Sequence, residues 1–226
     1  AGFAQSVQKG ESPALPALGH SVHVELQGLL PARWYHYRFM LGDAVSPTGR
    51  TRTAPAAGDP PGALRVAFAS CQRWEHGHYA AWRHLAADQP DLVLFLGDYI
   101  YEYATPKATT DLARTHSLRH ATTLADYRDR YALHKSDPAL QLAHATCPWA
   151  VTWDDHEVQN DYAADAGRGE AAGSAAFLAQ RSAAWQAFYE NMPLRAASLQ
   201  RSVLDARWDA LQSYRRRRWG RLAHIH

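Results

Sequence analysis

The chain has 226 residues, of which 46% are hydrophobic and 20% are charged, a composition typical of a folded globular protein rather than a disordered one. Its 24 lysines and arginines against 22 aspartates and glutamates leave a net charge of +2, so the total charge neither indicates nor excludes an anionic partner. Two cysteines are too few for a disulfide scaffold, and apolar runs as short as LVLFL predict no membrane span.

Residues 1–55 have the pattern of β-strands. SVHVELQGL and RWYHYRFML both alternate apolar and polar residues, the period of a half-buried strand, and VSPTGRTRTAP adds a third extended piece. Tyr35, four residues after Pro31, resembles the tyrosine of a tyrosine corner. In immunoglobulin and fibronectin type III domains this tyrosine opens a strand. Because three strands cannot bury two sheet faces, we expect the C-terminal part of an Ig/fibronectin III-like β-sandwich.

Residues 56–62, AAGDPPG, are rich in proline and glycine and are predicted to be a linker. Residues 63–226 form a second predicted region, which begins with two continuous apolar runs, LRVAFAS and DLVLFLG. Such runs are typical of strands buried on both faces. GHYAAWRHLAADQP, between them, has apolar residues at helical spacing. The order strand, helix, strand predicts a parallel sheet.

Further elements follow in the second region. TTLADYRDRYALHK is predicted to be a helix, because Thr123 and Asp126 have the spacing of a capping box. CPWAVTW is a third predicted buried strand, and FLAQRSAAWQAFYENMP is a long amphipathic helix. RRRRWGRLAHIH indicates the beginning of another strand. The fold class is therefore α/β.

Reactive side chains follow three of these strands at the points where each strand ends. They are Cys71 after LRVAFAS, Asp98, Tyr101 and Glu102 after DLVLFLG, and Asp154, Asp155, His156, Glu157 and Asn160 after CPWAVTW. Ligands of open α/β sheets bind outside the carboxyl ends of the strands, so we expect these groups to converge. Carboxylates crowded in this way repel one another unless cations hold them. The sequence therefore predicts a metal centre.

The ligand types indicate which metals would bind. The phenol of Tyr101 loses its proton only to a strong Lewis acid such as Fe³⁺, and the thiolate of Cys71 suits the same ion. Oxygens from Asp155, Asn160 and a bridging Asp98 suit a hard divalent ion such as Ca²⁺, Mg²⁺ or Mn²⁺. Two adjacent ions can clamp a phosphate and supply hydroxide for in-line attack.

Several motifs in order resemble the PhoD-like alkaline phosphatase/phosphodiesterase family of calcineurin-like metallophosphatases. They are FASCQ, GDYIYEY, DYRDRYALHKSDPALQ, TWDDHEVQNDYA, NMPLR and RRRRWGRLA. The resemblance runs from about residue 20 to the C-terminus, and the β-rich part resembles the N-terminal domain of that family. It implies a metallophosphatase-type β-sheet core flanked by helices, here incomplete, and hydrolysis of phosphate mono- or diesters by a metal-activated hydroxide.

The resemblance also implies roles for particular residues. Cys71, Asp98 and Tyr101 would bind Fe³⁺, with Asp98 bridging to a neighbouring Ca²⁺. Asp155 stands where the wider superfamily has the asparagine ligand of its GNHE motif, and Asn160 would be a further calcium ligand. His156 stands at the position of the catalytic histidine, which hydrogen-bonds a phosphate oxygen or protonates the leaving group.

Family members run further than this chain, whose first residues also lack an initiator methionine and a signal pattern. We therefore expect a fragment truncated at both ends, with weak or no activity alone. The resemblance further implies a periplasmic or secreted monomer with no nucleic acid partner.

Other interpretations apply to single features. Cys147 opens a strand and is interpreted as structural, and His224 and His226 as alternating strand positions. The aromatic residues around Trp34 would suit a non-catalytic module that binds cell wall or polysaccharide, and the arginines of RRRRW a nucleic-acid binder. Neither alternative explains why acidic and thiol groups end three strands.

Overall fold

The computed structural model describes residues 3, 5, 8–60, 62–107, 111–195 and 217–225. Its strands are β1 (Trp34–Tyr37), β2 (Met40–Leu41), β3 (Ala44–Val45), β4 (Gly49–Arg52), β5 (Val66–Ala69), β6 (Leu92–Phe95), β7 (Trp149–Val151), β8 (Arg217–Trp219) and β9 (Ala223–Ile225). Its α-helices are α1 (Ala80–Asp88), α2 (Leu124–Lys135), α3 (Pro138–Thr146) and α4 (Ala175–Asn191), with short 3₁₀ helices at Pro16–Leu18 and Trp74–His76. No helix among these residues is long and apolar enough to cross a membrane.

The N-terminal part contains two small antiparallel pairs, β1 with β4 and β2 with β3. The Tyr35 hydroxyl accepts a hydrogen bond from the backbone N–H of Leu30 at 2.9 Å, the local arrangement of a tyrosine corner. SVHVELQGL, in contrast, forms no strand, so this prediction is wrong. Its His23 instead stacks on Tyr189 of α4 and hydrogen-bonds the carbonyl of Leu194 at 2.9 Å. The sandwich itself stays a prediction.

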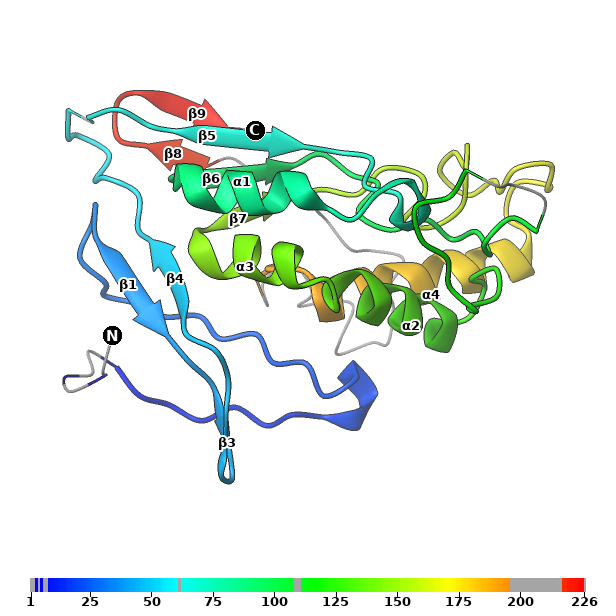
Figure 1. The fold of residues 1–226 in the computed structure, drawn as a ribbon, viewed down its shortest axis with the longest axis horizontal. Helices are drawn as coiled ribbons and strands as arrows, with labels where there is room; N and C mark the ends of the chain where they lie inside the picture. The colour runs from blue at the N-terminus through cyan, green and yellow to red at the C-terminus, as the bar shows by residue number, and fades with distance from the viewer. Residues whose placement is uncertain are drawn as a thin grey trace.

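The predicted parallel sheet is present, with strand order β5-β6-β7 (Figure 1). Trp82 of α1 packs on Phe95 of β6 and on Trp149 of β7, with ring centroids 6.0 and 5.1 Å apart. These contacts belong to the main hydrophobic core, which also contains Leu140 of α3. One face of the sheet is therefore covered by helices, as the β-α-β pattern indicates.

Burial on both faces is correct for β6 but wrong for β5. The side chains of β6 are largely buried, whereas Phe68 of β5 is 74% exposed and Val66 is 38% exposed. β5 is one of the two edge strands of the three-stranded sheet, and the described residues leave the face of Val66 and Phe68 open. An apolar run alone does not reveal whether a neighbour covers the strand.

The helices α2 and α4 agree with their predictions, whereas α3 has no counterpart among the predicted elements. The Thr123 side chain accepts from the backbone N–H of Asp126, whose carboxylate accepts from the N–H of Thr123, so α2 begins with a capping box. α2 packs on α4, as Figure 1 shows. At the C-terminus, β8 and β9 form an antiparallel hairpin. Arg215, Arg216 and His226, which entered the alternatives above, lie outside the described residues.

A buried ionic network holds the long connection between β6 and α2. The Glu75 carboxylate lies 3.2 Å from His116 and 3.3 Å from Arg73. Arg130, also buried, donates to the backbone carbonyls of Glu102 and Arg119. Burial alone would raise the pKa of Glu75, but the hydrogen bond with His116 and the charge of Arg73 lower it to about 2.

This low pKa predicts a loss of stability in acid. A carboxyl group whose pKa is lower in the folded than in the unfolded state stabilises the fold above its unfolded pKa, and this contribution disappears as the pH falls towards the folded pKa. When the pH falls from 5 to 3, we expect the unfolding free energy of Glu75→Gln to decrease by about 2 kcal/mol less than that of the wild type. Urea unfolding across this range measures the effect, with exposed Glu11→Gln as control. Parallel curves for wild type and Glu75→Gln would contradict it.

Candidate metal centre at the strand ends

The loops that follow β5 and β6 are joined by backbone hydrogen bonds. The N–H of Cys71 donates to the carbonyl of Gly97 at 3.2 Å, and the N–H of Gln72 donates to the carbonyl of Asp98 at 3.0 Å. Cys71 and Asp98 both have a left-handed backbone, with φ of 58° and 55°, which is unfavourable for residues with a Cβ. These bonds hold two predicted ligands side by side.

The loops after β6 and β7 also approach closely. Gly97 has a φ of +107°, and a Cβ added there would lie 2.6 Å from the backbone nitrogen of Asp154. Only glycine fits this position, because any other residue would push the two loops apart. The third strand end is thereby brought to the other two.

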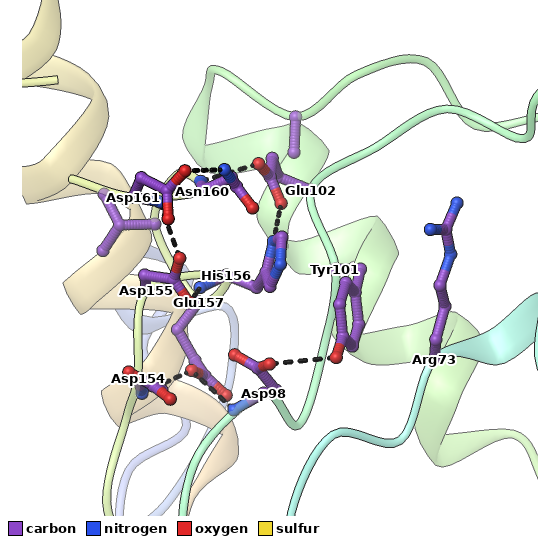
Figure 2. A network of polar contacts seen from close by, with 12 residues as sticks. Arg73, Asp98, Tyr101, Glu102, Asp154, Asp155, His156, Glu157, Asn160 and Asp161 are labelled. Atoms are coloured by element: carbon purple, nitrogen blue, oxygen red, sulfur yellow. Dashed lines mark hydrogen bonds and ion pairs between the residues drawn. The ribbon is translucent and has the colours of Figure 1, made fainter. Parts of the chain in front are cut away.

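Glu157 bonds both of these loops through one fully buried carboxylate (Figure 2). One of its oxygens accepts from the N–H groups of Asp98 at 3.0 Å and Asp154 at 2.7 Å, and the other accepts from the N–H of Tyr99. Burial raises the pKa of Glu157 to about 7, although the three donors act in the opposite direction. The sequence places Glu157 among the groups at the strand ends but does not predict this contact.

Asp98, Asp155 and His156 come together as predicted. Each offers one potential ligand atom, and these atoms lie within 4.8 Å of one another. Asp98 is buried, and one of its carboxylate oxygens, Oδ2, accepts from the Tyr101 hydroxyl at 2.9 Å. The other, Oδ1, has no hydrogen-bond partner among the described residues. A buried carboxylate oxygen without a partner is costly, and a bound cation would offset that cost.

Tyr101 and Cys71 lie together on the Asp98 side of the site. The pKa of Tyr101 is raised far above its usual value, first by burial, then by the hydrogen bond to Asp98 and the charges of Asp98 and Cys71. Arg73 lies on the other side of the phenol, with its guanidinium carbon 5.8 Å from the ring centroid (Figure 2). Without metal, the phenol therefore stays protonated, and only a strongly Lewis-acidic ion could replace its proton.

His156 is oriented by Glu102, a fully buried carboxylate. The ring nitrogen Nδ1 donates to Glu102 at 2.8 Å, and the imidazole packs on the Tyr101 ring with centroids 4.2 Å apart. Burial alone would lower the pKa of His156, but the hydrogen bond to Glu102 and the nearby carboxylate charges raise it. The sequence predicts Glu102 only as one of the groups that gather at the strand ends, and its position one residue after Tyr101 gives no sign of the contact with His156.

Asn160 lies at the periphery of this arrangement. Its backbone N–H donates to Glu102 at 2.9 Å, and its side-chain amide donates to Asp161 at 2.7 Å. Asp161 in turn donates its backbone N–H to Asp155 at 2.6 Å. Asn160 is thus connected to the site through its neighbours, and its role as a calcium ligand stays a prediction. Cys71 and Cys147 are both free thiols, and Cys147 is buried, consistent with a structural role.

The electrostatics of the site suit a cation. Burial and the charges of Asp98 and Asp155 raise the pKa of Asp154. Such mutual repulsion between carboxylates disappears when a positive ion lies between them. The ligand atoms of Asp98, Asp155 and His156 lie together, one Asp98 oxygen has no partner among the described residues, and the Tyr101 phenol bonds the other, so this group of side chains fits a metal centre.

Comparisons with known proteins all indicate the same family. Residues 66–226 match the family model described as PhoD-like phosphatase, and residues 1–55 match the model described as PhoD-like phosphatase, N-terminal domain. Alkaline phosphatase D of Bacillus subtilis (strain 168) is 47% identical over 224 residues, which are 98% of this chain and 37% of that protein. A solved structure described as "Structure of PhoD" matches with a TM-score of 0.90 and 47% identity, over 98% of this chain and 42% of that one. The chain thus spans less than half the length of these relatives.

The contact between Glu102 and His156 generates a prediction for the metal-free protein. Because this carboxylate raises the pKa of the imidazole, Glu102→Gln should lower it. A nuclear magnetic resonance titration of the His156 ring protons measures the change. The matched control is Glu190→Gln, which removes a buried carboxylate that pairs with Arg128 instead. A pKa of His156 that is the same in all three proteins would contradict the role of Glu102.

Proposed function

Because the chain belongs to the PhoD-like phosphatase family, we propose that it takes part in the hydrolysis of phosphate mono- or diesters at a metal centre built on Asp98 and Asp155, with His156 beside them as the catalytic residue. The observation that carries this proposal is the convergence of these three groups around a buried Asp98 oxygen without a partner. The relatives are more than twice as long as this chain. The hydrolytic activity is therefore a proposal for this chain.

We assign Cys71, Asp98 and Tyr101 to Fe³⁺, and Asp98, Asp155 and Asn160 to Ca²⁺. The hydrogen bond from the Tyr101 hydroxyl to Asp98 supports the first assignment, because a metal ion there would be shared by the two oxygens that now share a proton. The preference of calcium for carboxylate and amide oxygens supports the second. When bound, such ions supply the positive charge that polarises a phosphoryl group and lowers the pKa of a water nucleophile.

His156 would supply the proton. Its Nδ1–H is held by Glu102, and Nε2 has no hydrogen-bond partner among the described residues. An imidazolium in this orientation can donate from Nε2 to a phosphoryl oxygen or to the leaving-group oxygen. Glu102 stabilises the charged form and fixes the ring, as a carboxylate does for histidine in many active sites.

The polymer-binding alternative is disfavoured by the surroundings of Trp34. The guanidinium carbons of Arg50 and Arg52 lie 4.0 and 5.5 Å from its ring centroid, so the ring already has partners. Tyr35 likewise uses its hydroxyl within the fold.

By family resemblance we place the protein in the periplasm or outside the cell, as a monomer.

Removing the central carboxylate tests the metal centre. We expect Asp98→Asn to abolish metal binding and hydrolysis of p-nitrophenyl phosphate and bis-p-nitrophenyl phosphate, because both proposed ions lose a shared ligand. Elemental analysis and initial rates on the full-length protein measure the two effects. The control is Asp129→Asn on the exposed side of α2. Full activity of Asp98→Asn would exclude this mechanism.

The iron assignment has a spectroscopic test. A phenolate bound to Fe³⁺ gives a broad visible charge-transfer band, so we expect the purified protein to be coloured and Tyr101→Phe to lose the band. Visible absorption together with elemental analysis decides the matter, and Tyr35→Phe serves as control. A folded, colourless and iron-free protein that still hydrolyses phosphate esters would overturn the iron assignment and leave a purely divalent centre.

A further inference from the structure

Glu157 makes contacts that a core-filling residue does not need. Its side chain is fully buried, and its two oxygens accept three backbone hydrogen bonds from two different loops. One oxygen, Oε2, is shared by Asp98 after β6 and Asp154 after β7. This single carboxylate oxygen therefore links the loops after β6 and β7 and limits the distance between them.

The donors surround a strained residue. Asp98 has a left-handed backbone with φ of 55°, which costs free energy for any residue other than glycine. Its own N–H and the next N–H, that of Tyr99, both donate to Glu157. The three N–H donors favour the ionised carboxylate against the effect of burial, and hydrogen bonds to a charged acceptor are about twice as strong as those between neutral groups. They can hold Asp98 in the conformation that places its carboxylate near Asp155.

The contact cannot be reproduced by similar residues. A glutamine at position 157 has nearly the same volume, but its amide nitrogen would face an N–H donor, so one side of the contact would be lost. An aspartate retains the charge but is shorter by one C–C bond of about 1.5 Å. It could not reach both loops from the same backbone position.

We propose that Glu157 is a positioning residue, whose buried carboxylate sets the backbone of Asp98 and its distance from the β7 loop so that the ligand atoms of Asp98 and Asp155 converge on one cation. This role rests on the proposed metal-dependent function, because it explains how the ligands are held before the metal binds. Glu157 itself is not assigned to the metal, since both of its oxygens are occupied by backbone N–H groups.

The test uses full-length protein stripped of metal and compares Glu157→Gln, Glu157→Asp and wild type. The matched control is Glu190→Gln, which removes a buried carboxylate whose partner is Arg128. Hydrogen exchange of the Asp98, Tyr99 and Asp154 amides measures the contact itself. Titration with Mn²⁺, followed by electron paramagnetic resonance, measures its consequence for the site.

We expect Glu157→Gln to exchange these three amides at least about 10-fold faster and to bind Mn²⁺ about 10- to 100-fold more weakly, the usual effect of removing a group that supports metal ligands. Glu157→Asp should fall between Gln and wild type in both measurements. The control should keep the exchange rates and the Mn²⁺ affinity of wild type even if it unfolds at a lower temperature. With metal restored, kcat should fall while KM stays within about twofold, because the ligands rather than the substrate contacts change.

Wild-type exchange and Mn²⁺ affinity in Glu157→Gln would overturn the proposal. If that variant does not fold, the wild type alone decides: rapid exchange of the Asp98, Tyr99 and Asp154 amides, at the rate of exposed loops, would show that the contact is not maintained. A wild type that has slow amides but neither binds metal nor hydrolyses esters would contradict the proposed function instead. The two failures are therefore distinguishable.

Discussion

The hydrogen bonds between the loops after β5, β6 and β7 are the constraint on which this site depends. Where a parallel ladder ends, backbone N–H and C=O groups need new partners. Here the partner is the neighbouring loop: Cys71 donates to Gly97, and the N–H groups of Asp98 and Asp154 meet on Glu157. The residues that make these bonds carry or adjoin the reactive side chains. The same hydrogen bonds therefore satisfy the backbone groups and bring the proposed ligands together.

Buried charge is distributed unevenly across the assembled site. Glu157 is compensated by three backbone N–H groups, and Glu102 by the imidazole of His156 and the N–H of Asn160. Asp98 is left with one oxygen that no described residue satisfies. The cost of burying carboxylates is thus concentrated at the point where the ligand atoms converge. A cation bound there would recover that cost, which couples metal binding to the stability of the strand ends.

Much of this arrangement could be predicted from the sequence, because apolar runs define the sheet and the residues after them must share an edge. The pattern could not reveal that β5 is exposed, since burial depends on which neighbour covers the strand. The alternation in SVHVELQGL failed because period-two patterning does not supply a pairing partner. Glu157 and Glu102 were expected at the strand ends, but their contacts could not be predicted because their main partners are 54 to 59 residues away in the chain.

The contact with Glu102 favours one of two roles for His156. Its position within 4.8 Å of the Asp98 and Asp155 ligand atoms would permit coordination as well as proton transfer. The hydrogen bond with Glu102 does not involve Asp98 or Asp155, so a cation bound to those two carboxylates would leave it in place. The imidazole therefore retains a partner that stabilises its protonated form even beside a metal. A protonated ring cannot bind a cation but can donate to a phosphate oxygen, which favours the catalytic role.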